Sequence, residues 1–156
     1  MSTNTESSAP AQVDVRGPRF AAWVTTGALV ATLVVAGFSN IGAAVLLGLQ
    51  TVVFAIGAWR GPRQHPYGLI FARLVAPRLG AVTDKESVAP LKFAQLVGFV
   101  FALVGTVGFV SGVSFLGLIA TGFALVAAFL NAAFGICLGC QIYPLVVRLR
   151  NTPSPA

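Results

Sequence analysis

Residues Leu116–Val147 read LGLIATGFALVAAFLNAAFGICLGCQIYPLVV, and this stretch contains no charged residue. It also holds the only two cysteines of the chain, Cys137 and Cys140. About 20 consecutive apolar residues are enough to cross the hydrocarbon core of a bilayer. The stretch therefore predicts a membrane-spanning helix, which we place at residues 116–140.

The composition of the whole chain agrees with a lipid environment. Of the 156 residues, 56% are hydrophobic and 9% are charged, whereas soluble domains are about 25% charged. The net charge of +6 comes from ten Lys and Arg against four Asp and Glu. These basic residues flank apolar runs and do not alternate with aromatic residues, so membrane lipids are the expected surroundings and nucleic-acid binding is not expected.

Three further apolar runs, each close to the length of a bilayer crossing, lie before Leu116–Val147 in the chain. They predict spans at residues 20–38, 41–59 and 93–110. The connections at 39–40 and 111–114 are so short that successive spans must form antiparallel hairpins. The expected fold is all-α, an integral membrane four-helix bundle made of two such hairpins.

The remaining segments divide the chain into a membrane domain and two tails. Residues 1–15 are rich in Ser, Thr, Ala and Pro and predict a disordered tail. Residues 16–150 form the membrane domain, and 151–156 form a short C-terminal tail. The polar loop at 60–92 contains an apolar segment, Tyr67–Pro77, that is either a short helix on the membrane surface or a solvated loop.

Charge distribution predicts the orientation of the bundle. All ten cationic residues lie near the N-terminus, in the loop 60–92 or near the C-terminus, and the two short turns contain none. Positively charged segments remain on the cytoplasmic side of membranes. We therefore expect both termini and the loop 60–92 to be cytoplasmic.

Glycines and amides within the spans indicate how the helices pack. Small residues allow helix backbones to approach closely in lipid, so the glycines are expected to face inward. Gln50, Gln95 and Asn131 are polar residues within predicted spans, and each needs a partner there. They are interpreted either as interhelical hydrogen-bonding groups or as the lining of a solute path. The spans hold no carboxylate, lysine or arginine, so an ion- or proton-coupled transporter is not expected.

The cysteine pair has the spacing C-x-x-C. Two such residues in a regular helix have Cβ atoms about 5–6 Å apart, whereas a disulfide needs about 3.8 Å. A disulfide therefore requires a distorted helix, and Gly139 together with a kink from Pro144 would provide the distortion. Because the pair is predicted toward the C-terminal end of a helix, the helix dipole would disfavour a thiolate. Near the cytoplasmic boundary the pair is expected to be reduced at rest.

Two other interpretations of the pair stay open at this point. Cys137 and Cys140 could be small apolar residues that pack a glycine-rich helix. The second is a zinc site, which needs four ligands. A dimer could supply four cysteines, whereas the only histidine, His65, lies in the loop, where we expect it in solvent. No cofactor or metal is predicted.

Several segments together resemble a known family. They are RGPRF at 16–20, PYG at 66–68, KFAQ at 92–95 and, most specifically, LNAAFGICLGCQIY at 130–143. The chain resembles, over nearly all of its length after Val13, the bacterial and notably actinobacterial membrane family DUF4395, with its NAAFGxCLGC motif. This resemblance implies a location in the bacterial plasma membrane. The family's genomic company implies a cytosolic thioredoxin-like or sulfurtransferase protein as partner.

The resulting hypothesis is a multi-pass membrane protein whose Cys137 and Cys140 exchange thiol and disulfide, or sulfane sulfur, at the cytoplasmic end of the fourth span. The sequence leaves open whether such a protein is an enzyme. The alternatives are a structural or accessory subunit without chemistry, and a small-solute permease lined by Gln50, Gln95 and Asn131.

Overall fold

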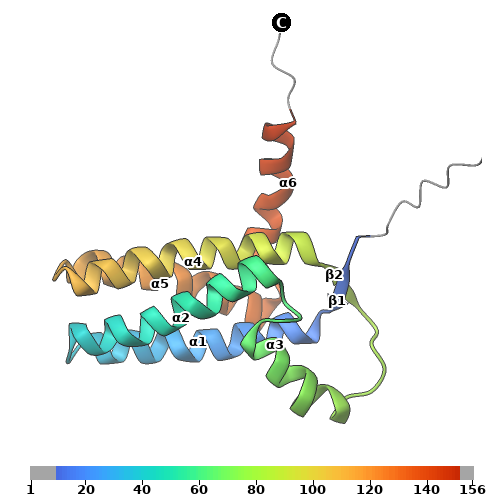
Figure 1. Cartoon of the computed structure of the whole chain (residues 1–156), viewed down its shortest axis with the longest axis horizontal. Helices are drawn as coiled ribbons and strands as arrows, with labels where there is room; N and C mark the ends of the chain where they lie inside the picture. The colour runs from blue at the N-terminus through green and yellow to red at the C-terminus, as the bar shows by residue number, and fades with distance from the viewer. Residues whose placement is uncertain (1–9, 152–156) are drawn as a thin grey trace, which may run out of the picture.

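Four long helices dominate the computed structural model, which describes residues 10–151 (Figure 1). Each is long and apolar enough to cross a membrane, as the sequence predicted. They are α1 (Arg16–Ala36), α2 (Asn40–Arg60), α4 (Val88–Val110) and α5 (Ser114–Phe134).

Two of these helices begin four or five residues earlier than expected. The sequence placed their starts at residues 20 and 93, but α1 begins at Arg16 and α4 at Val88. The reason is that Pro18 and Pro90 lie in the first helical turn, where the backbone N–H groups have no partner within the helix. A proline there costs no hydrogen bond, so each helix can begin before its proline.

The two predicted hairpins pack side by side as a four-helix bundle. Figure 1 shows α1 alongside α2, and α4 alongside α5. The bundle closes because α2 also packs along α4 and α1 along α5. At the end with the short turns, the Asn40 side-chain amide donates a hydrogen bond of 2.8 Å to the Ser114 hydroxyl, which joins one hairpin to the other.

Small and aliphatic side chains fill the interior of the bundle. Leu29, Leu47 and Ala102 are fully buried. A Cβ added at Gly105 would lie 2.6 Å from a Leu47 methyl group, so this glycine lets α2 approach α4 closely. Outward positions carry the exposed valines and phenylalanines of the four helices, as expected where lipid is the solvent.

The expectation that the glycines face inward is correct for part of them. A Cβ at Gly108 would lie 2.7 Å from the backbone nitrogen of Gly117, where α4 and α5 nearly touch. Gly27 and Gly122, in contrast, have no neighbouring atoms within 4 Å of such a Cβ. For these two the expectation is wrong, because open space on their side leaves no close helix contact to protect.

The charged end of the bundle carries structure that the sequence did not predict. Strand β1 (Gln12–Asp14) pairs antiparallel with β2 (Lys85–Ser87). Within the segment predicted as a disordered tail, β1 is therefore ordered, while residues 1–9 lie outside the described residues. Residues 152–156 of the predicted C-terminal tail also lie outside them.

The loop 60–92 contains helical structure, as its first interpretation expected, while the position of that helix on a membrane surface stays a prediction. The helical structure runs through α3 (Pro66–Ile70), a π-helical turn at Phe71–Val75 and a 3₁₀ turn at Ala76–Arg78. Figure 1 shows α3 and both strands at the end of the bundle opposite the short turns. This arrangement places the cationic segments toward one side. That this side is cytoplasmic stays a prediction.

The fourth span is shorter than predicted, and this is the main correction to the fold. The sequence indicated one helix over 116–140, but α5 ends at Phe134 and a separate helix, α6 (Leu138–Arg150), follows it. Figure 1 shows α6 leaving the bundle at a steep angle. The break lies at Gly135, with φ +69°, and not at Pro144, which lies inside α6.

A matched pair of glycine substitutions tests the packing of α4 on α5. Gly108→Ala places a methyl group against the backbone of Gly117 and should destabilise the protein by about 1–3 kcal/mol. Gly122→Ala meets open space, so the better helix propensity of alanine should leave stability unchanged or raise it by up to about 1 kcal/mol. Thermal unfolding midpoints in detergent would measure both. Equal midpoints for the two variants would contradict this packing.

Candidate functional site: the cysteine pair and a buried polar cluster

The segment between α5 and α6 is built by one glycine and one cysteine. Gly135 takes a left-handed conformation that favours glycine, and its N–H donates to the Asn131 carbonyl at 3.1 Å. Cys137 is the N-cap of α6, where its Sγ accepts a hydrogen bond of 3.3 Å from the backbone N–H of Cys140. The pair thus lies at a helix N-terminus, whereas the sequence analysis expected it toward a C-terminus.

This correction reverses the electrostatics of the pair. A helix N-terminus carries partial positive charge, so it stabilises an anionic sulfur there. The Arg19 guanidinium lies beside the same turn, because a Cβ at Gly135 would be 3.3 Å from its Nη2 atom. The helix N-terminus therefore favours the thiolate of Cys137 once the pair is reduced.

Cys137 and Cys140 form a disulfide, with their Cα atoms 5.2 Å apart. The predicted requirement for a distorted helix is met because Cys137 lies outside α6, in an extended conformation. Gly139 has a different role from the one expected. A Cβ there would lie 2.6 Å from the Cα of Ala94, so Gly139 lets the first turn of α6 pack directly on α4. The redox state at rest in the cell stays a prediction.

A partly open cavity of about 250 Å³ has Cys137 among its lining residues. It lies between α1, α4, α5 and the first turn of α6, and its polar side chains include Gln95, Asn131 and Cys137. Alanines and other aliphatic residues, with aromatic residues such as Phe101 and Phe123, supply most of the remaining wall. Two of the three amides predicted from the sequence therefore meet one of the predicted cysteines.

The third amide, Gln50, is not among the residues that line this cavity. It is buried, and its Oε1 accepts a hydrogen bond of 2.8 Å from the Tyr67 hydroxyl. Gln50 thus holds the loop 60–92 against α2, so its partner is neither another long helix nor a solute path. Burial raises the pKa of Tyr67, which keeps its hydroxyl protonated as the donor.

His65 is buried, and the expectation that it lies in solvent is wrong. Only 2% of it is exposed, and neither ring nitrogen has a well-aligned hydrogen-bond partner, although the Gln95 side chain lies within hydrogen-bonding reach. It packs against Gly57, where an added Cβ would lie 2.6 Å from the imidazole and 2.9 Å from the Oε1 of Gln95. Its ring also meets that of Tyr67 edge-on, with centroids 5.1 Å apart. The absence of a side chain at Gly57 makes room for this cluster.

Burial lowers the pKa of His65 to about 4, and the adjacent Gln95 side chain opposes this shift in part. The imidazole is therefore neutral near pH 7. Its position could not be read from hydropathy, because a single histidine in a polar loop has no periodic pattern around it. The only hint was its place directly before PYG at 66–68, one of the family-like segments.

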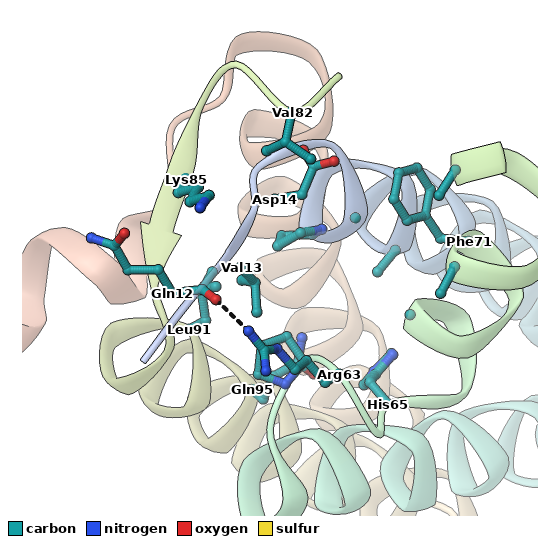
Figure 2. A pocket seen from close by; sticks show the side chains of 17 residues that line it. Gln12, Val13, Asp14, Arg63, His65, Phe71, Val82, Lys85, Leu91 and Gln95 are labelled. Carbon is teal, nitrogen blue, oxygen red and sulfur yellow. Dashed lines mark hydrogen bonds between the residues drawn. The ribbon is translucent and has the colours of Figure 1, made fainter. Parts of the chain in front are cut away.

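A second cavity, of about 570 Å³, opens beside this histidine (Figure 2). It lies between the β1–β2 ribbon, the start of α1 and the α3 segment. Arg63 crosses one side, where it donates a hydrogen bond of 2.8 Å to the carbonyl of Gln12. Gln95 is among the residues that line both cavities.

The comparisons with known proteins identify one family. A family model described as "Domain of unknown function (DUF4395)" matches residues 13–148. No curated protein and no solved structure matches the chain.

Titration of His65 should make stability depend on pH. The ordinary pKa of 6.5 applies in the unfolded chain, whereas the folded value is about 4. Between these values the unfolded state binds the additional proton, so the free energy of unfolding should fall as pH drops from about 6.5 to about 4. His65→Gln removes the titrating group and should flatten this part of a stability–pH curve. Parallel curves for both proteins would contradict the buried, neutral histidine.

Proposed function

This chain belongs to the DUF4395 family, and on that premise we propose that it is a membrane protein whose Cys137–Cys140 pair exchanges disulfides with a cytosolic protein. The four apolar helices would hold the pair at the inner surface of the bacterial plasma membrane. The observation that carries the proposal is that Cys137 is the N-cap of α6. There the sulfur is close to N–H groups that stabilise its anionic form.

The two cysteines have different roles in this exchange. The Cys137 thiolate attacks a disulfide of the partner, forms a mixed disulfide and releases one partner thiolate. The Cys140 thiolate then attacks the sulfur of Cys137, which closes the intramolecular disulfide and releases the second partner thiolate. The pair gives up two electrons and the partner takes them. The reverse sequence oxidises the partner by the same steps.

The surroundings of the pair support access from the aqueous side. Cys137 and Cys140 follow the apolar span α5 and are both partly exposed. Exposed Leu145 and Leu149 lie on α6 with Arg148 and Arg150. This combination is typical of an amphipathic helix on a membrane surface, so α6 would keep the pair at the boundary between lipid and cytosol.

A partner of thioredoxin or sulfurtransferase type suits this position. Sulfane-sulfur transfer would use the same atoms. A partner persulfide would pass its outer sulfur to Cys137, and Cys140 would then displace that sulfur as hydrogen sulfide while closing the disulfide. The adduct on Cys137 distinguishes disulfide exchange from sulfane-sulfur transfer, because only sulfane-sulfur transfer adds a single sulfur atom to Cys137.

A structural role is the second candidate, and one contact favours it. The disulfide closes the turn at which α6 leaves the bundle, and Gly139 packs there against Ala94. In that case the pair fixes the direction of α6 and reacts with nothing. A permease is less well supported, because Gln50 binds Tyr67 and does not join Gln95 and Asn131 at their cavity.

Single-cysteine variants test the proposal. After reduction, Cys140→Ser retains Cys137 at the N-cap, whereas Cys137→Ser retains Cys140 within the helix. The first variant should react with iodoacetamide at pH 7 about tenfold faster than the second, because its thiolate is the better stabilised one. Alkylation rates followed by intact-protein mass spectrometry would measure this difference.

The same variants decide between chemistry and structure. In vesicles, the Cys140→Ser variant should trap a mixed disulfide with added oxidised thioredoxin. The double variant Cys137→Ser/Cys140→Ser should trap none. Two equally unreactive thiols, combined with a loss of stability in the double variant, would refute the exchange and favour the structural role.

A further inference from the structure

A groove lies on the outer surface of the bundle, along the C-terminal part of α2. Its volume is about 400 Å³. Six of its lining residues lie on α2, between Thr51 and Arg60, and Phe99 lines it from α4. This part of α2 is about 14 Å long at 1.5 Å per residue. Val52 and Trp59 in its wall are more than half exposed, so the groove faces the surroundings of the bundle.

The wall of the groove is mainly apolar. Val52, Ile56 and Trp59 follow one another at i, i+4 and i+7, so they share one face of α2. The Trp59 ring meets that of Phe99 edge-on, with centroids 5.9 Å apart. Tryptophan side chains are favoured at the level of the lipid headgroups. The groove therefore runs from the headgroup level at Trp59 into the hydrocarbon at Val52, where an acyl chain fits its length.

Two cationic side chains lie at the headgroup end of this groove. Arg60 lines the groove from α2 and is exposed. Lys92 comes from α4, on the same face as Phe99, because the two residues are spaced i and i+7. Its side chain reaches the end of α2, where a Cβ added at Gly61 would lie 3.7 Å from the Lys92 Cδ atom. The two cations thus lie on either side of the mouth of the groove.

The protein itself does not neutralise these two cations. Throughout residues 10–151, neither Arg60 nor Lys92 has a side-chain hydrogen bond or an ion pair. Asp14, which lies at the same end of the bundle, is held by Arg16 at 2.8 Å. The positive charge at the mouth of the groove is therefore available to an anion from outside the chain.

The two parts of the groove together specify a phospholipid. Its phosphate would lie between Arg60 and Lys92, and one acyl chain would follow the apolar wall toward Val52. A guanidinium pairs with phosphate oxygens through two parallel N–H groups, and an ammonium adds a point charge. A zwitterionic headgroup brings its own ammonium next to the phosphate, which the two cations repel. A headgroup with net negative charge has no such repulsion and is therefore favoured.

We propose that the groove between α2 and α4 is a binding site for an anionic phospholipid, with the headgroup phosphate between Arg60 and Lys92. Basic pockets between membrane-spanning helices bind anionic headgroups in this manner. Neither cysteine lines the groove. The site therefore goes beyond the proposed disulfide exchange and does not depend on it.

Trp59 can report on this site, because the chain has only two tryptophans. Trp23→Phe leaves Trp59 as the sole indole. Trp59→Phe leaves Trp23, which is exposed on α1 and packs against Phe129. Bromine atoms on acyl chains quench indole fluorescence on contact. The full chain is placed in mixed vesicles of phosphatidylglycerol and phosphatidylcholine in which one lipid is brominated, and then in vesicles with the label exchanged.

The quenching by each lipid gives its relative affinity beside each tryptophan. Trp59 should show a preference of about five- to twentyfold for phosphatidylglycerol, since one cation near the surface contributes about fivefold. Trp23, away from the groove, should show a preference below about twofold. Phosphatidylglycerol and phosphatidylcholine both contain a phosphate diester, so the comparison isolates the net charge of the headgroup.

Two sets of variants, made with Trp23→Phe, locate the lipid. Arg60→Gln and Lys92→Gln should each lower the preference at Trp59 about fivefold. Arg78→Gln removes the same charge from an exposed position outside the groove and should leave the preference unchanged. Ala55→Phe fills the groove and should abolish the preference, whereas Val45→Phe, exposed elsewhere on α2, should preserve it. Circular dichroism confirms that each variant keeps its helices.

Four outcomes would overturn the proposal. Equal quenching of Trp59 by the two brominated lipids would exclude selection of an anionic headgroup. The same preference at Trp23, or an equal loss with Arg78→Gln and Arg60→Gln, would indicate a diffuse surface charge instead of a site. Weaker quenching of Trp59 than of Trp23 by both lipids would mean that a second copy of the chain covers the groove.

Discussion

At Gly135 the backbone takes a left-handed turn that a residue with a Cβ atom enters only at an energetic cost. This single conformation ends α5, sends the chain out of the bundle and lets α6 start afresh at Cys137. Without it, the two cysteines would lie on one face of a continuous helix. Their Cβ atoms would then be too far apart for a disulfide, and no free backbone N–H group would be near. The geometry and the charge preference of the pair both depend on this break.

Two further glycines shape the sites because their missing side chains leave room for close packing. At Gly139 the first turn of α6 lies against the backbone of α4, which positions Cys137 next to the smaller cavity. At Gly57 the missing side chain leaves space for His65 and Gln95. In a bundle whose helices gain little from hydrophobic association in lipid, such close contacts are the main means of fixing one element against another.

How far the sequence predicted these features depends on the range of the interactions involved. The four spans followed from hydropathy, because each needs only its own residues and lipid. The break at Gly135 was missed because apolar residues continue on both sides of it, so hydropathy does not change there. The β1–β2 pairing and the burial of His65 were missed because both depend on segments far apart in the chain, and no periodic pattern marks them.

Gln95 connects these observations, since its side chain lines both cavities. On one side burial keeps His65 neutral, because no charged group repays the loss of water. On the other side the N-terminus of α6 favours a charged sulfur at Cys137. The two groups thus take opposite charge preferences from environments separated by one amide. An amide can both donate and accept hydrogen bonds, so Gln95 adds a polar group here without bringing a charge into the bundle. This is the physical reason why an amide suits this position better than a carboxylate.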